Sequence, residues 1–404
     1  MAPPSDRADD GDAAVARAEG PVRRAPVLLG LLQAFLFALV GVALVDVVYG
    51  RVDSDRNLSA DSPLEPAEYL VWKNRPGFTN ETTRISSLGL RSAEIPADAP
   101  AEELRVLGVG PSLVYGGGPD PPHMDRVWAP FLEQRLHADV GGEWRVLNGG
   151  VNGYSTVQAA RWALQLLPRV EPDLVLLFVT PGRISLLDPS GTRKSRPWRG
   201  RPAPNDLLDR WPEPLLPAVL AVHDLLMARS SLYVRHRRSG PLEGHPDHVH
   251  RFMLGEHLLD DPWVQDGLAR TFAEIEMLAE GCAERGVELR VVQLLDGVQY
   301  SSRRWNIYLS GAQQRGAPPI RTKRTEPQRL LGELLDERGL AWWTLQDAMS
   351  VLDARHHWTL SDRIHWSADG HELVAGALLE ELVGEAGLLD LLRSRRAAAP
   401  RGSD

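Results

Sequence analysis

The chain has a single cysteine, Cys282, among its 404 residues. One thiol cannot form an intramolecular disulfide bond, and it cannot build a thiolate metal cluster. Cys282 lies near the end of a stretch with helical periodicity, EMLAEGCAERGVELR, where we expect a small buried side chain. The sequence therefore indicates neither a disulfide-stapled fold nor a cysteine nucleophile.

Positive charge is also scarce, because 45 Lys and Arg residues stand against 54 Asp and Glu residues, a formal net charge of −9. A surface of this sign does not attract nucleic acid or an anionic membrane, so we expect no nucleic-acid partner. The histidines of GHPDHVHRF (His245, His248 and His250) match no zinc-binding spacing. We expect neither a metal nor a cofactor.

One long apolar run stands near the N-terminus, at residues 26–45 (PVLLGLLQAFLFALVGVALV), with Gln33 as its only strongly polar residue. Twenty residues in a helix span about 30 Å, the thickness of the hydrocarbon core of a bilayer. No good small-residue cleavage site follows, which favours an uncleaved signal-anchor helix over 26–48. The preceding arginines predict a single pass through the cytoplasmic membrane, with residues 1–25 inside and the rest of the chain outside.

Composition divides the remainder of the chain. Residues 1–25 and 394–404 are predicted to be disordered, and residues 49–100 to form an extended stalk and lead-in segment that packs onto the main domain. The main domain covers 101–393, with an insertion at 184–261. This insertion contains a predicted helix over 215–235 and a Pro/Arg-rich stretch, SGTRKSRPWRGRPAP. We expect this stretch to be a solvated surface loop, with a site for an acidic polymer as the alternative.

The main domain alternates short apolar runs with segments of helical periodicity. The apolar runs that we interpret as strands are 104–110, 144–150, 173–180, 287–295 and 340–346. Buried strands that alternate with amphipathic helices predict a parallel sheet covered on both faces. The expected fold is therefore α/β, a flavodoxin-like doubly wound parallel sheet of about five strands.

Chemically useful residues follow the strands or precede the last helix. Ser112 follows the first strand, Gly153 follows the second, and Asp362-Arg-Ile-His365 precedes the final amphipathic segment. In a doubly wound sheet these positions meet at the carboxyl edge. Serine is a poor nucleophile until a base removes its proton, and His365 is the natural base, with Asp362 to orient it. The pattern predicts a nucleophilic hydrolase.

These segments, between residues 85 and 382, resemble the SGNH (GDSL-type) hydrolase superfamily. LRVLGVGPS resembles its first block with Ser112 as the nucleophile, and VLNGGVNGYST resembles its second block, in which Gly153 would supply an oxyanion-hole N–H. Asp362-Arg-Ile-His365 resembles the fifth block. ISSLGLR, which ends at Arg91, resembles the lead-in of membrane-anchored bacterial members. The resemblance implies a triad of Ser112, Asp362 and His365.

The sequence departs from the family pattern at two places. Pro111 stands where the family usually has Asp, and the third block, Thr180-Pro-Gly-Arg-Ile184, lacks the family's Asn. We assign the missing oxyanion donor to Arg183, with Asn152 and an empty position as the alternatives. The loss of one donor typically lowers the rate by about 10²–10³-fold.

Three functions remain open at this point. The first, which we favour, is an extracytoplasmic esterase that acts on acyl esters of a carbohydrate or lipid. The second is an O-acyltransferase that moves an acetyl group onto an exported polysaccharide, and the third is a catalytically lapsed scaffold that binds glycan. Trp342, Trp343 and Trp358 are candidates for a sugar-binding groove, although Trp342 lies in a predicted strand and is expected in the core.

Overall fold

The computed structural model describes most of residues 62–398. Its described ranges are 62–67, 69–96, 99–118, 121–184, 195–199, 201–230, 233, 262–314, 323–350 and 364–398, together with residues 33, 37, 40 and 41. Three predicted features lie outside the described residues. They are Asp362, the disordered N-terminus at residues 1–25 and most of the membrane helix. Gln33, Phe37, Val40 and Gly41 of that predicted helix are helical. None of the helices that the structure describes is both long and apolar enough to cross a membrane.

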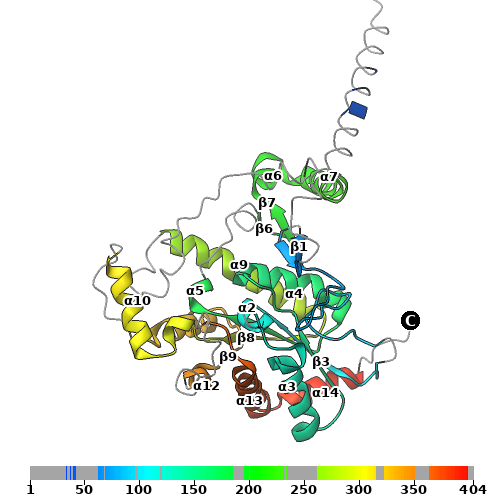
Figure 1. Cartoon of the computed structure of the whole chain (residues 1–404). Helices are drawn as coiled ribbons and strands as arrows, with labels where there is room; N and C mark the ends of the chain where they lie inside the picture. The colour runs from blue at the N-terminus through cyan, green and yellow to red at the C-terminus, as the bar shows by residue number, and fades with distance from the viewer. Residues whose placement is uncertain are drawn as a thin grey trace, which may run out of the picture.

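A five-stranded parallel sheet forms the centre of the molecule (Figure 1). Its strands are β3 (Leu104–Val109), β4 (Trp144–Asn148), β5 (Leu174–Val179), β8 (Glu288–Gln293) and β9 (Trp342–Thr344). Each lies within one of the five predicted apolar runs. The order in space is β4-β3-β5-β8-β9, the 2-1-3-4-5 order of flavodoxin-like sheets. The predicted α/β sheet is confirmed.

The central strand β5 shows why both faces of the sheet must be covered. All six residues of its sequence LVLLFV are buried. Val175, Leu177 and Val179 join one hydrophobic core, and Leu174, Leu176 and Phe178 join the other, because successive side chains of a strand point to opposite faces. Helices α4 (Thr156–Val170) and α9 (Pro262–Ala283) lie on the first face, and α3 (Trp128–Arg135) and α13 (Ala368–Gly384) on the second.

The part of the domain around the sheet also contains shorter or peripheral helices. They are α2 (Ser112–Tyr115), η1 (Met124–Arg126), the π-helical η2 (Leu136–Val140), α5 (Pro181–Ile184), η8 (Gly297–Gln299), α10 (Ser302–Gln314), α11 (Glu326–Asp336), α12 (Gln346–Ser350) and α14 (Leu388–Ala398). Helix α14 continues past the predicted start of the tail at residue 394. Its Arg395 pairs with Glu288 at 2.6 Å, and its Arg396 donates to Asp173 at 2.8 Å.

The lead-in segment packs on the sheet domain. Strands β1 (Leu64–Ala67) and β2 (Val71–Asn74) form an antiparallel hairpin. Leu70, Ile85 and Leu90 are almost completely buried, and Leu70 and Leu90 belong to the core that α4 and α9 cover.

The described part of the insertion is more regular than the sequence suggested. The stretch expected to be a solvated loop contains an antiparallel hairpin, β6 (Ser195–Trp198) and β7 (Arg201–Pro204). Helix α6 (Asn205–Arg210), the short η4 (Glu213–Leu215) and α7 (Leu216–Arg229) follow it. Helix α7 begins one residue after the predicted start of the helix over 215–235.

Candidate active site

The nucleophile candidate lies in a tight turn between β3 and α2. Ser112 is the first residue of α2, and Pro111 before it has an extended backbone (φ −75°, ψ −169°). At Gly110 a Cβ atom would lie 2.7 Å from Val114 Cγ2 and 2.9 Å from Phe178 Cβ. Only glycine fits at this position without a shift of its neighbours. The turn therefore leaves Ser112 half-buried at the carboxyl edge of the sheet.

His365 reaches the same edge from the other end of the chain. Its Nε2 lies 2.8 Å from Ser112 Oγ. Ser367, two residues later, caps α13 by accepting a hydrogen bond from the N–H of Gly370. When the imidazole carries its proton on Nδ1, the Ser112 hydroxyl donates to Nε2. The structure thus brings together the predicted nucleophile and the predicted base in the geometry that proton transfer needs.

The third member of the predicted triad, Asp362, lies outside the described residues, so its role stays a prediction. The described chain resumes at Ile364. Gly118 packs against the imidazole from the opposite side of the turn, since a Cβ there would lie 3.1 Å from His365 Cβ. With φ +126°, Gly118 also has a backbone that other residues rarely adopt.

The predicted oxyanion residue Gly153 lies in the turn after β4, with φ +80°. Trp72 of β2 holds this turn, because its indole N–H donates to the Asn152 carbonyl at 2.8 Å. The Asn152 side chain lies beside the nucleophile. A Cβ on Gly117 would collide with Asn152 Oδ1 while standing only 3.2 Å from Ser112 Cβ. Asn152 therefore lies next to the nucleophile turn, with its amide oxygen as the atom nearest Gly117.

Arg183, our first assignment for that donor, lies in α5 after β5. Its side chain is outside what the structure describes, so this assignment remains a prediction. The preceding Gly182 donates its N–H to Asp296 Oδ2 at 2.7 Å. A Cβ at Gly182 would lie 2.6 Å from the same oxygen, so the Asp296 carboxylate occupies the space that a larger residue would need. The carboxylate of Asp296 thus packs against the backbone of the third block at Gly182.

A buried arginine that sequence reasoning did not single out fixes the far end of the nucleophile turn. The Arg91 side chain donates from Nη1 to the carbonyls of Tyr115 (2.5 Å) and Gly116 (3.0 Å). Its Nη2 donates to the carbonyls of Thr82 (3.2 Å) and Pro122 (2.7 Å). None of these four acceptors is a carboxylate, and burial lowers the pKa of Arg91. Arg91 therefore holds two loops and the end of α2 together.

Two more side chains hold the end of α2. The Asn148 amide, at the end of β4, donates to the Val114 carbonyl at 2.9 Å, and the indole N–H of Trp128 donates to the same oxygen at 2.9 Å. The Asn148 Oδ1 accepts from the Gly150 N–H at 3.0 Å, which also shapes the turn that leads to Gly153. In the sequence, Asn148 is marked only by its place in the Asn-Gly-Gly motif of the second block, and Arg91 only by its place at the end of ISSLGLR. Both act as positioning residues.

His371, the second histidine near the site, is completely buried. Its Nδ1 accepts the Trp128 backbone N–H at 3.3 Å, and its ring packs edge-on against Trp366 at 5.1 Å between centroids. Burial lowers the pKa of His371 to about 3, with the nearby Arg91 and His365 contributing in the same direction. The imidazole is therefore neutral at pH 7 and acts as a packing and hydrogen-bonding residue.

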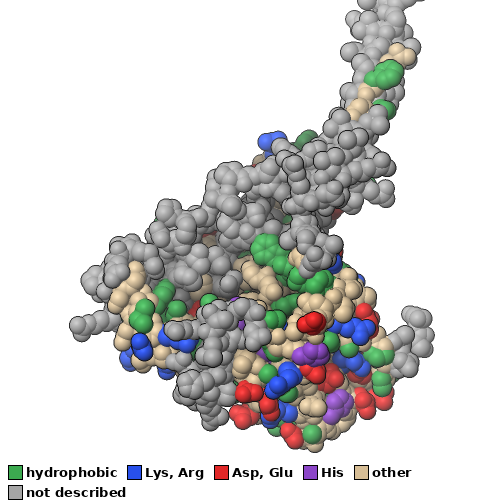
Figure 2. Space-filling model, in the orientation of Figure 1, with side chains coloured by type: hydrophobic (Ala, Val, Ile, Leu, Met, Phe, Trp, Pro, Cys, Tyr) green, Lys and Arg blue, Asp and Glu red, His purple; other side chains and the backbone are tan. Residues whose placement is uncertain are grey.

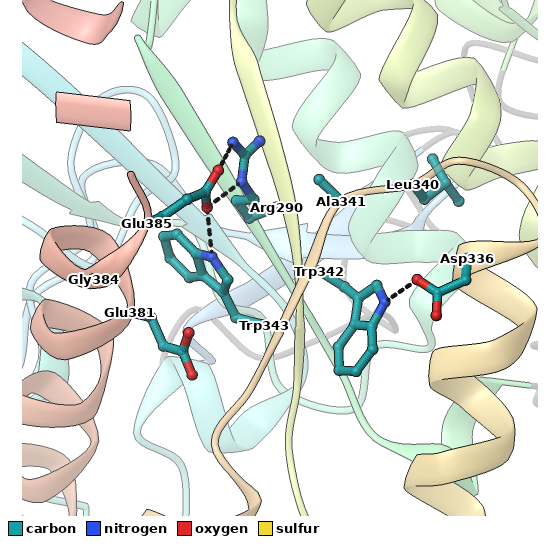
Figure 3. Close-up of a pocket in the computed structure, with 9 residues that line it drawn as sticks. All are labelled: Arg290, Asp336, Leu340, Ala341, Trp342, Trp343, Glu381, Gly384 and Glu385. Atoms are coloured by element: carbon teal, nitrogen blue, oxygen red, sulfur yellow. Dashed lines mark hydrogen bonds and ion pairs between the residues drawn. The ribbon is translucent and has the colours of Figure 1, made fainter. Parts of the chain in front are cut away.

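A pocket of about 440 Å³ lies elsewhere, around β9 (Figure 3). Trp342 and Trp343 line it, and their indole N–H groups donate to Asp336 and Glu385 at 2.8 Å each. Glu385 follows the last residue of α13, a helix of 17 residues whose first turn is next to His365. The helix alone spans about 25 Å, so this pocket is at the opposite edge of the sheet from Ser112.

No protein-family model matches the sequence, and no curated protein matches it. Among solved structures, the chain is similar to TesA, with 14% identity and a TM-score of 0.33, over 69% of this chain and 98% of that one. A catalytic mutant of Axe2, an acetylxylan esterase from Geobacillus stearothermophilus, is 15% identical over 69% and 94%, with a TM-score of 0.35.

A third similar structure is a two-domain esterase (CEX) active on acetylated mannans, 12% identical over 73% of this chain and 51% of that one, with a TM-score of 0.34. Identities this low do not carry an activity from one protein to another.

Proposed function

We propose that this chain is a serine hydrolase of the SGNH type that cleaves acyl esters. The observation that carries the proposal is the 2.8 Å contact between Ser112 Oγ and His365 Nε2 at the carboxyl edge of the sheet. A nucleophile within hydrogen-bond reach of its base is the signature of this chemistry. The predicted Asp362 completes the triad by orienting the imidazole and stabilising its protonated form.

The proposed reaction has two steps. His365 takes the proton of the Ser112 hydroxyl while Oγ attacks the ester carbonyl, and the same proton then goes to the leaving alcohol as the acyl–oxygen bond breaks. In the second step water loses a proton to His365 and attacks the acyl-enzyme, and the proton returns to Ser112 as the acid leaves. Each step balances within the Ser112–His365 pair, the ester and one water.

The backbone N–H groups of Ser112 and Gly153 would hold the developing oxyanion. We now favour Asn152 over Arg183 as the side-chain donor. Asn152 lies against Gly117 and close to Ser112, and Trp72 fixes its backbone. To donate to the oxyanion, the side-chain amide would turn its NH2 group to the position near Gly117 that the oxygen occupies in the structure.

We propose an extracytoplasmic site of action, because the apolar run 26–45 and the arginines before it predict a signal-anchor. Acyl esters of carbohydrates or lipids are the substrates accessible there. Acetylated xylan and acetylated mannan, which are named for two similar structures, are the first polymers to test.

The test uses the full chain purified in detergent and an activated short-chain ester. We expect Ser112→Ala and His365→Ala to abolish turnover, whereas Ser394→Ala, at an exposed position of α14, should leave it unchanged. Wild-type turnover by Ser112→Ala would refute the nucleophile. Acyl transfer to a sugar acceptor with little hydrolysis would favour the O-acyltransferase. A wild type without any turnover would leave the glycan-binding scaffold as the better account.

A further inference from the structure

Helix α7 (Leu216–Arg229) is apolar on two opposite sides. Its inner side buries Leu216, Leu220 and His223, at the i, i+4 and i+7 positions of one helical stripe. Every exposed residue from 216 to 226 is also apolar, namely Pro217, Ala218, Ala221, Val222, Leu225 and Leu226. A surface helix normally has polar residues on its outer side, and a helix that is apolar all round is normally covered.

The outer stripe is continuous and large. Leu215, Ala218, Val222, Leu225 and Leu226 follow helical spacing and are named here the α7 face. Leu215 is 50% exposed, Val222 56% and Leu225 58%. Trp211, 42% exposed, lies four residues before Leu215 in the link between α6 and η4. An aromatic residue beside an aliphatic stripe is typical of helices that lie in a membrane interface.

The segment of the sequence that contains the α7 face is richer in basic residues than the chain as a whole. Residues 193–238 contain ten Lys and Arg residues and only four Asp and Glu residues, although the chain as a whole has a net charge of −9. Among the side chains that the structure describes there, Arg199 and Arg210 are exposed, and so are three acidic ones, Asp206, Asp209 and Glu213. Arg199 pairs with Glu213 at 3.0 Å. The described charges around α7 therefore balance, and the argument for a membrane contact rests on the apolar side chains of the α7 face.

The fold places α7 next to the end of the chain that carries the predicted anchor. Tyr69, in the turn between β1 and β2, makes a 2.9 Å hydrogen bond with His223 of α7. Fifteen residues, 49–63, separate the predicted membrane helix from β1, a reach of at most about 50 Å. Helices α6 and α7 and the hairpins lie at one end of the molecule, and α3, α13 and α14 at the other (Figure 1).

The opposite end has a different surface. Figure 2 shows acidic and basic side chains intermixed at the end formed by α3, α13 and α14. Such a surface suits water and gives no reason to approach a bilayer. The two ends of the molecule therefore differ in the polarity of their surfaces. This difference is expected of a tethered domain with one end towards the membrane and the other towards water.

We propose that the α7 face rests on the outer surface of the membrane that holds the predicted N-terminal helix. Val222 and Leu225 would lie at the boundary between headgroups and acyl chains. The domain is then held by two contacts, one spanning and one interfacial, which fixes its orientation. This proposal rests on the proposed anchor and is independent of ester hydrolysis.

The test compares two exposed valines on helices at opposite ends of the molecule. The full chain, as Val222→Cys or as Val383→Cys of α13 (51% exposed), is labelled with an environment-sensitive thiol probe. Cys282 can remain, because it is buried and burial raises the pKa of its thiol to about 12. Each protein is reconstituted into phosphatidylcholine–phosphatidylglycerol vesicles with and without nitroxide-labelled lipid. We expect at least twofold quenching of the probe at residue 222 and none at residue 383.

Equal quenching of the two probes would overturn the proposal. Two other occupants of the α7 face predict different results. A second copy of the chain would make the signal at residue 222 depend on protein density in the vesicle and not on the nitroxide lipid. Coverage by residues 234–261 of the same chain would shield the probe in detergent and in vesicles alike. A chain that fails to float with vesicles would refute the anchor and the docking together, whatever its activity towards esters.

Discussion

Ser112 and His365 are 253 positions apart in the sequence, yet Ser112 Oγ and His365 Nε2 lie 2.8 Å apart in the structure. The contact follows from the topology. Ser112 is placed by the end of β3, next to the centre of the sheet, and His365 by the segment that enters α13 on one of the two faces. A parallel sheet directs such segments to one edge.

Because the two side chains act on one proton, their mutations should not add. We expect Ser112→Ala, His365→Ala and the double mutant to show the same residual rate with an activated ester, within a factor of about three. Single-turnover kinetics of the three variants measures this. A double mutant slower than both single mutants by the product of their effects would mean that the residues act separately.

The choice between Asn152 and Arg183 as oxyanion donor predicts opposite mutational effects. Asn152→Ala should lower kcat by about 10²-fold and change KM little, because the lost hydrogen bond forms only in the transition state. Arg183→Ala should leave kcat within about threefold. Steady-state kinetics of both variants decides the matter, and the reverse pattern would return the assignment to Arg183.

Arg91 should affect the rate through the nucleophile turn. Replacement by Met leaves the buried carbonyls of Tyr115 and Gly116 without the guanidinium donor, at about 1–3 kcal/mol for each unsatisfied group. We expect Arg91→Met to lower kcat by at least 10-fold with little change in KM, and Arg91→Lys to restore part of the loss, since an ammonium can still reach some of the acceptors.

Thermal unfolding of the same variants separates positioning from stability. A destabilised Arg91→Met that retains the wild-type kcat at temperatures where it is folded would assign Arg91 a structural role alone.

His371 should make folding sensitive to acid. Its pKa is about 3 in the folded protein and near 6.5 in an unfolded chain, so below pH 6.5 the unfolded state binds the proton and the folded state does not. The free energy of unfolding should therefore fall by about 2 kcal/mol between pH 7 and pH 5 from this residue alone. His371→Gln should lower stability at pH 7 but remove this part of the pH dependence.

Urea unfolding of wild type and His371→Gln at the two pH values measures the difference. An identical change in both proteins would show that His371 does not cause the acid sensitivity.

The strands were predictable because a parallel strand that is buried on both faces consists of consecutive apolar residues. The sequence LVLLFV of β5 is an example. Ser112, Gly153 and His365 were predictable as candidates because each follows a strand or precedes a helix in a recognisable motif. The 2.8 Å contact could not be read from the sequence, which specifies an edge but not a rotamer.

Arg91 was not predictable as a positioning residue for a different reason. Its four partners are backbone carbonyls, which every residue possesses. No acidic residue in the sequence therefore marks the place where the Arg91 guanidinium binds. The β6–β7 hairpin was missed because its strands are rich in Pro and Arg, residues that indicate a loop. In both cases tertiary contacts, rather than local preference, decide the structure.

The most direct test of the proposed chemistry is the reaction of the full-length protein with a fluorophosphonate probe, followed by peptide mass spectrometry. A serine that His365 activates should be phosphonylated rapidly, and other hydroxyl groups should not react. We predict a single adduct on the peptide that contains Ser112, lost in Ser112→Ala and strongly slowed in His365→Ala. An unmodified Ser112 peptide in the wild type, or an adduct on another serine, would contradict the account.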